Sequence, residues 1–227
     1  GSFDELRFYS RAFDNQEAME LYESERRAVA YYSFDNDTFE DDSRNNYNGT
    51  GVNSPSFAQG VSGNALSLNT GSTANQYVNL QDFSLGDSFT VTVEVCPAVD
   101  LASYDMVPVA KHTSAGGNQF MIGFNYGKYY LCINNATHTT QPIGILPNQW
   151  SNITVTVEKL SSSSTRVKLY ENGTLKITWT PNAVLGNTTG KAWVIGQEWD
   201  GSVASDFFRG KIDEVGFYNY VMPAEDI

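Results

Sequence analysis

The chain has 227 residues, of which 41% are hydrophobic and 13% aromatic, and its formal net charge is −12 at pH 7. This length and composition suit a globular protein with one large domain and exclude a disordered chain. The negative charge opposes binding to a polyphosphate backbone, so nucleic acid is not expected as a partner. No apolar run reaches the roughly 18 residues that a transmembrane helix needs, so membrane insertion is not expected either.

The two ends of the chain carry nearly the same sequence. Residues 1–11 and 210–220 both place an Asp-Glu pair in a short alternating apolar run, followed by an aromatic pair. A turn and an acidic helix start follow in each copy. Such a self-match, about one domain length apart, is typical of a tandem array. We therefore predict that residues 1–26 are the terminal strand and helix of a preceding repeat, and that residues 27–227 form one domain.

Helix signals are confined to the two ends of the chain. We expect residues 3–12 to form an extended strand and residues 14–25 to form a helix that packs on the main domain. Asp14 and Glu17 have the spacing of a capping box, which marks the start of this helix. The second helix start is expected at residues 223–227, where a proline stands at an early helical position.

Between these ends the sequence has the pattern of β-strands. Residues 89–95 alternate, with Phe89 and three valines on one face and polar residues on the other. Asn172-Gly173 is a strong hairpin signal. Further strands are expected at residues 29–34, 65–68, 76–80, 106–111, 119–124, 128–133, 153–157, 166–171, 175–180, 192–196 and 210–218. This number and spacing of strands predict an all-β fold, an antiparallel two-sheet β-sandwich or jelly roll.

The chain has two cysteines, Cys96 and Cys132. They are too few for a disulfide framework and lack the spacing of zinc ligands. Two interpretations remain open. One is a disulfide bond formed in an oxidising compartment, which would stabilise the fold by roughly 4 kcal/mol in the chain-entropy model. The other is a pair of buried free thiols. We predict the bond.

Five segments carry a family pattern in the same order. The first runs from residues 29–35 through a polar loop to residues 60–68. The other four are residues 89–97, 148–157, 166–179 and 212–227. Together they resemble the laminin G-like, concanavalin A-type jelly rolls over about residues 28–227. The resemblance implies a β-sandwich. Because this family is functionally broad, it implies little about the ligand.

Catalysis is not expected. Jelly-roll glycosidases place carboxylates at alternate positions of one strand, where they act as a pair. Glu198 and Asp200 have this spacing, but the third acidic residue that should follow them is missing. The chain has no G-x-S-x-G nucleophile motif, and only His112 and His138 could serve as bases. The sequence therefore predicts that the protein is not an enzyme.

Calcium binds carboxylate, amide and carbonyl oxygens, and one candidate site is residues 196–201. This segment is similar to the calcium loop of pentraxins. The resemblance implies that Glu198 and Asp200 bind the ion through their side chains and Trp199 through its carbonyl, and that Asn118 contributes from a neighbouring loop. The alternative is a solvated hairpin.

A second candidate calcium site joins the first and last strands, as is common in jelly rolls of this kind. Its ligands would be Asp35, which follows the first strand, and Asp213, which lies on the last. The alternative is a flexible acidic loop whose Asp and Asn residues serve turns.

Aromatic residues in loops or at strand ends are candidates for a glycan site, because sugar rings stack on exposed aromatic side chains. They are Tyr104, Tyr126, His138 and Trp199. The alternative is that they are core residues whose polar tip reaches water.

Taken together, these features predict a non-catalytic binding or adhesion module of a secreted or cell-surface protein. Its partner would be a glycan or an extracellular protein, with calcium as the candidate cofactor. Two alternatives stay open. One is a structural spacer that stacks with neighbouring repeats of the same chain. The other is a carbohydrate-binding accessory domain of an enzyme.

Overall fold

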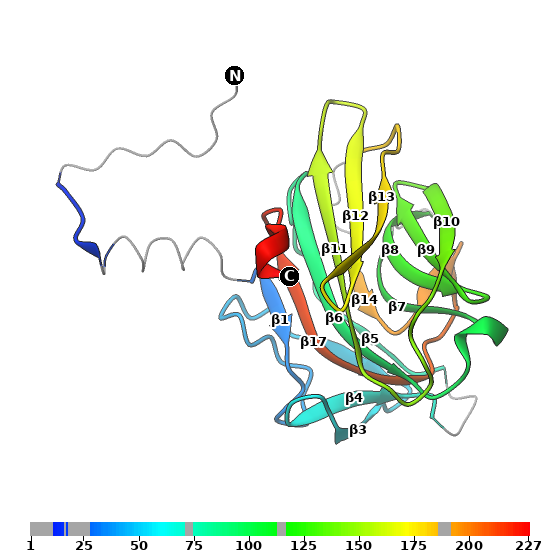
Figure 1. Cartoon of the computed structure of the whole chain (residues 1–227). Coiled ribbons are helices and arrows are strands. Elements are labelled where there is room, and N and C mark those ends of the chain that lie inside the picture. Colours follow the sequence, from blue (N-terminus) through cyan, green and yellow to red (C-terminus); the bar gives the residue numbers. More distant parts are fainter. Residues whose placement is uncertain (1–10, 16, 18–27, 71–74, 113–116, 186–191) are drawn as a thin grey trace.

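The computed structural model describes residues 11–15, 17, 28–70, 75–112, 117–185 and 192–227, and these form two antiparallel sheets packed face to face (Figure 1). Sheet A has the order β13 (Thr174–Trp179), β12 (Thr165–Glu171), β11 (Ser151–Lys159), β6 (Phe89–Pro97), β17 (Gly210–Tyr218), β4 (Asn64–Leu68) and β3 (Ser56–Gln59), with β1 (Ala30–Tyr32) also paired to β17. Sheet B has the order β10 (Ala136–Pro142), β9 (Lys128–Ile133), β8 (Asn118–Asn125), β7 (Asp105–His112), β14 (Trp193–Ile195), β5 (Tyr77–Asn79) and β2 (Thr50–Val52).

Besides the helix start near Asp14, the described residues form three short elements outside the two sheets. They are the hairpin of β15 (Glu198–Asp200) and β16 (Val203–Ser205) and the 3-10 turns η1 (Leu101–Ser103) and η2 (Ala224–Asp226). The predicted all-β sandwich is thus confirmed. Within the described residues, no helix has the length and apolar character needed to cross a bilayer.

The main core lies between the two sheets. The alternation predicted for β6 is confirmed, because Phe89 and the three valines that follow it at every second position are fully buried there. Trp193 of β14 packs in this core against rings from both sheets. Its ring centroid lies 4.8 Å from that of Phe217 in β17 and 5.7 Å from that of Phe120 in β8. Burying each of these large side chains contributes roughly 2–3 kcal/mol to folding.

A second, smaller apolar cluster lies on the outer face of sheet B. It consists of Tyr77, Val107, Ala110, Met121, Cys132 and Val194. Trp199 and Ala204 of the β15–β16 hairpin pack on this cluster together with Phe207. The hairpin therefore covers apolar surface that the sheet would otherwise expose, which explains why it lies against the sandwich.

The predicted disulfide bond is wrong, since Cys96 and Cys132 are both free and buried. Cys96 follows core-facing Val95 in β6, so strand alternation turns it to the outer face of sheet A. Cys132 belongs to the cluster on the outer face of sheet B. The two thiols thus point away from opposite sides of a sandwich whose sheets lie about 10 Å apart. A disulfide requires Cα atoms within roughly 7 Å.

Thiol titration provides a test of this correction. Unfolded, unreduced protein should show both cysteines of the chain as reactive thiols. The folded protein should react slowly, because burial raises the pKa of Cys132 to about 11 and also raises the pKa of Cys96. A titration that finds no thiol after unfolding would restore the bond.

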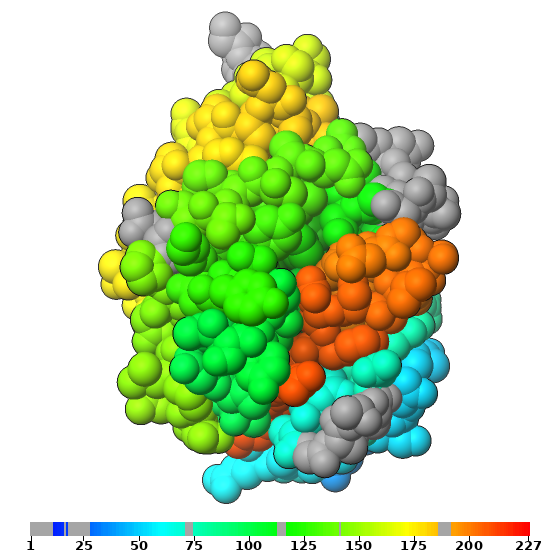
Figure 2. All heavy atoms as spheres, turned by 90° about the vertical axis from the view of Figure 1, so that its right-hand side faces the viewer, coloured from blue at the N-terminus to red at the C-terminus, as the bar shows by residue number. Residues whose placement is uncertain are grey.

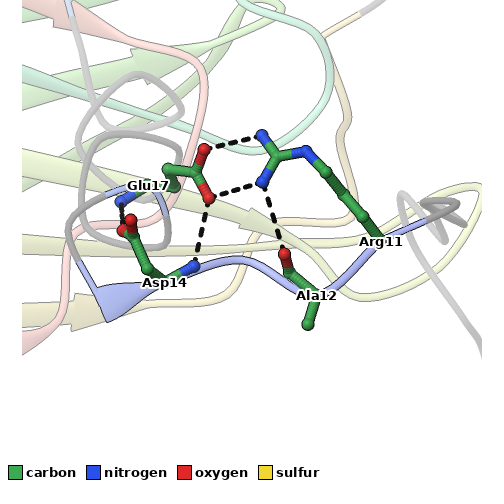
Figure 3. Close-up of polar contacts among 4 residues, drawn as sticks. All are labelled: Arg11, Ala12, Asp14 and Glu17. Atoms are coloured by element: carbon green, nitrogen blue, oxygen red, sulfur yellow. Dashed lines mark hydrogen bonds and ion pairs between the residues drawn. The ribbon is translucent and has the colours of Figure 1, made fainter.

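The predicted strand over residues 3–12 and the helix over residues 14–25 lie mostly outside the described residues. The start of the helix is described, and it forms the predicted capping box (Figure 3). The amide of Glu17 donates to Oδ1 of Asp14 at 2.8 Å, and the amide of Asp14 donates to Oε2 of Glu17 at 3.1 Å. The Arg11 guanidinium donates to both oxygens of Glu17, at 2.6 and 2.7 Å. Two of the backbone donors at this helix start are therefore satisfied locally.

Candidate functional site

The β15–β16 hairpin brings acidic residues to the outer face of sheet B. Figure 2 shows this face, with the hairpin in orange beside the green strands of the sheet. Glu198 and Asp200 occupy alternate positions of β15, so their side chains leave the same side of the strand. Asp206 follows β16, and its carbonyl accepts a hydrogen bond from the amide of Val107 in β7 at 2.9 Å. Asp105 stands at the start of β7.

These four carboxylates are close enough to perturb one another. The pKa of Asp206 is raised to about 6, first by burial and then by the charges of Glu198, Asp105 and Asp200. Burial also raises the pKa of Asp105. The cluster therefore carries crowded negative charge near neutral pH, which a bound cation would relieve.

Several polar atoms at this cluster are poised to accept or donate. Nδ2 of Asn118 donates a short hydrogen bond to Oε2 of Glu198, and Oγ of Ser205 donates to Oε1 of Glu198 at 2.7 Å. Among the described residues, buried Oδ1 of Asn118, buried Oδ1 of Asp105 and both polar side-chain atoms of Gln197 have no hydrogen-bond partner. Buried polar atoms of this kind are costly unless water, an ion or a ligand satisfies them.

The structure thus places Asn118 against Glu198, and it brings Glu198, Asp200 and Asp105 close enough to act on the carboxylate of Asp206. Asp105 and Asp206 could not be identified from the sequence, since only the hydrogen bond from β7 to the end of the hairpin places them there. In the described part of the chain, no group of three or more His, Cys, Asp or Glu side chains is placed to hold a metal ion by itself. Amide and carbonyl oxygens would have to complete any coordination shell.

The four aromatic candidates lie in three different places. Trp199 is half-buried, with its ring centroid 6.2 Å from that of Tyr77 and 5.4 Å from that of His112. Part of its indole therefore anchors the hairpin. His138 was expected in a loop or at a strand end but lies within β10, where its ring stacks on that of Trp179 with the centroids 5.2 Å apart.

Tyr104 and Tyr126 form the third place. The amide of Tyr126, in the β8–β9 turn, donates to the carbonyl of Tyr104 at 3.2 Å. The Arg209 guanidinium lies 4.6 Å from the Tyr104 ring centroid, a cation–π contact. Tyr126 is 62% exposed. It could stack on a ligand at the surface without any rearrangement.

The acids expected to join the first and last strands do come together. Oδ1 of Asp35 accepts a hydrogen bond from the amide of Asn64 at 3.1 Å, in the loop that also contacts Asp213. Asp213 is fully buried, and its carboxylate accepts hydrogen bonds from the amides of Val61, Ser62 and Glu214. Burial raises the pKa of Asp213 to about 6, and the charge of Asp35 acts in the same direction. Backbone amides thus already donate hydrogen bonds to most of the carboxylate oxygens of Asp35 and Asp213.

Comparison with known families assigns most of the chain. A laminin G-type model of the concanavalin A-like lectin/glucanases superfamily matches residues 70–227. No curated protein matches the chain in sequence.

Solved structures with the same fold come from bacterial enzymes and toxins. Domain 4 of AbnA, an extracellular arabinanase from Geobacillus stearothermophilus solved with arabinotriose, has a TM-score of 0.68 and 19% identity, over 89% of this chain and 97% of that one. The binding domain of Paraclostridial Mosquitocidal Protein 1 has a TM-score of 0.65 and 18% identity. The botulinum neurotoxin serotype D binding domain has 0.65 and 14%. The chain covers 50% of each toxin domain. At these identities the likeness shows the fold alone.

Proposed function

The chain belongs to the concanavalin A-like lectin/glucanases superfamily, and from this membership we propose that it is a non-catalytic, glycan-binding module of a secreted or cell-surface protein. The observation that carries the proposal is the β15–β16 hairpin, where carboxylates and amide oxygens that have no partner among the described residues lie near the half-buried indole of Trp199. Sugar recognition uses such acceptors for hydroxyl groups and such rings for stacking. The solved structures of this fold named above are binding domains or, in one case, hold a bound arabinotriose.

We propose calcium as the cofactor of the hairpin site. The donor set suits it, because Glu198 and Asp200 offer carboxylates while Asn118 and Asp105 each hold a buried oxygen without a partner among the described residues. A bound calcium ion would supply positive charge that sugar hydroxyls can coordinate. The loop at Asp35 fits less well, because amides donate to both oxygens of fully buried Asp213 there, whereas Asp200 at the hairpin is exposed.

Calcium should therefore raise the melting temperature and promote glycan binding. An ion that binds only the folded state stabilises it by about 2.7 kcal/mol at 100 times its dissociation constant. Asp200→Asn should abolish this rise, and the matched variant Asp35→Asn should retain it. The measurements are thermal unfolding and a glycan-array screen, each with calcium and with chelator.

Two results would contradict this assignment. Loss of the calcium effect in Asp35→Asn alone would move the ion to the loop that joins the first and last strands. A melting temperature and a glycan screen that are both indifferent to calcium and to chelator would remove calcium from the proposal.

A second candidate is an accessory domain of a carbohydrate-active enzyme. The observation that favours it is the extent of the match to the arabinanase domain, 97% of which is covered. The full-length sequence tests it, because a neighbouring catalytic domain would support an accessory role. Further copies of the repeat would instead support adhesion by a tandem array, with a protein partner or stacking repeats as its alternatives.

A further inference from the structure

A polar groove of about 470 Å³ crosses the outer face of sheet A, on the opposite side of the sandwich from the β15–β16 hairpin. In Figure 1 this is the left-hand side, where β1, β17 and η2 lie. The side chains on its floor come from β6, β11 and β17, at positions that alternate with core residues. They are Thr92, Glu94, Asn152, Thr154, Glu214 and Tyr218.

Three carboxylates line this groove, those of Glu94 and Glu214 from adjacent strands and that of Asp226 from η2. Oε1 of Glu94 accepts a hydrogen bond from Nδ2 of Asn152 at 3.1 Å, and Oδ1 of Asn152 accepts one from Oγ1 of Thr154 at 3.0 Å. Glu214 lies on β17, next to β6. The groove therefore presents a connected row of acceptors and donors on a rigid sheet, which is what fixes the orientation of a polar ligand.

A β-bulge places Glu214 in the groove. Between Asp213 and Gly216, β17 has one more residue than β6 has opposite it, so the register shifts. Glu214 has φ of +49°, an uncommon value for a residue with a long side chain. The extra residue turns Asp213 toward the loop at residues 60–64 and leaves Glu214 facing the groove.

The self-match of the chain repeats this arrangement in sequence. Glu5 and Tyr9 stand where Glu214 and Tyr218 line the groove, and the residue before Glu5 is again an aspartate. Arg7 stands where the second copy has Gly216, so the sequence between the acid and the tyrosine is not repeated in full. An acid and a tyrosine at fixed spacing thus recur in both copies.

We infer that this groove is a second ligand site, which binds an uncharged oligosaccharide. Carboxylates, amides and threonine hydroxyls accept and donate to rows of sugar hydroxyls, and Tyr31 and Tyr218 supply ring surface at its edge. Glu94 and Glu214 repel uronic and sialic acids through like charge. The inference rests on the proposed glycan binding but not on the hairpin or on calcium.

The test is titration calorimetry with short neutral arabino-, xylo- and gluco-oligosaccharides, compared with oligogalacturonides, sialyllactose and chitosan oligosaccharides. A neutral oligosaccharide should bind wild-type protein with calcium or with chelator. The double variant Glu94→Gln/Glu214→Gln should weaken this binding at least tenfold, because hydrogen bonds to charged groups are the stronger ones. Asp87→Asn, which changes an exposed carboxylate outside both candidate sites, should leave it unchanged.

Misfolding is not expected to obscure this result. Burial raises the pKa of both Glu94 and Glu214, so removing their charges should leave the melting temperature equal or higher. Unchanged affinity in the double variant, or loss of binding only in Asp200→Asn, overturns the groove site and leaves the hairpin proposal standing. A preference for the acidic or the cationic oligosaccharides overturns the ligand class. Failure of wild-type protein to bind any glycan overturns the proposed function as well.

Discussion

Asp213→Ala is expected to lower the unfolding free energy by about 3 kcal/mol, because it removes a fully buried acceptor that links the amides of two chain segments. The carboxylate is fully buried and accepts from the amides of Val61 at 2.9 Å and Glu214 at 3.0 Å, with a weaker contact to Ser62 at 3.5 Å. It thereby fixes the loop at residues 60–64 to the last strand. For a chain of this size the melting temperature should fall by about 6 to 12 °C.

Asp213→Asn is the matched control, since it removes the charge but keeps one of the two oxygens that accept from the amides of Val61 and Glu214. The folded-state pKa of Asp213 is raised to about 6 from its ordinary value of 3.8. Such a group contributes most stability below its unfolded pKa and loses that contribution as the pH rises through the folded pKa. The contribution of Asp213 to the unfolding free energy should thus fall between pH 4 and about pH 7. Asp213→Asn should make the unfolding free energy less dependent on pH over this range.

Asp206 has a raised pKa of about 6 as well, so Asp206→Asn should remove a second part of the same pH dependence. Melting curves at several pH values measure both effects. If Asp213→Ala unfolds no earlier than Asp213→Asn at pH 7, the amide contacts are not the reason for burying this carboxylate.

Strands whose two faces differ could be predicted closely. In β6 and β11 apolar residues alternate with polar ones, and the expected ranges fall within two residues of the observed ends at either side. The segment Ala136–Pro142 has no such alternation, yet it forms β10. Backbone pairing to β9, with His138 opposite Leu131, holds it as an edge strand. Hydrogen bonding to a neighbour leaves no pattern in the sequence of the edge strand itself.

The candidate sites show the same division. Glu198 and Asp200 are close in sequence and could be identified, whereas Asp105 and Asp206 join them only through contacts between β7 and the hairpin. The bulge that turns Glu214 toward the groove could not be predicted from the sequence either. Asp213-Glu214 looks like one outward and one inward residue of a regular strand, and only the extra residue of β17 relative to β6 turns both away from the core.

Lys111 offers the second large effect, because its ammonium group is buried in the main core. The side chain is 1% exposed, and Nζ lies 3.3 Å from Oδ1 of Asp82 and donates to the carbonyl of Phe83 at 3.2 Å. The same atom lies 4.8 Å from the ring centroid of Trp193, a cation–π contact. Asp82 itself keeps 31% of its side chain in solvent. The buried ammonium group of Lys111 therefore depends on Asp82 for its stabilisation more than the hydrated carboxylate of Asp82 depends on Lys111.

Asp82→Ala should lower the unfolding free energy by about 3 to 5 kcal/mol, because it removes a carboxylate partner of a buried cation. Lys111→Met should cost less than about 1 kcal/mol, since the methionine keeps the length of the stem against Trp193 and Asp82 stays hydrated. The double variant should resemble Lys111→Met alone, because nothing charged is then left in the core. Chemical denaturation of the three variants measures these differences. Equal losses in both single variants would mean that packing of the lysine stem, and not its charge, accounts for its place in the core.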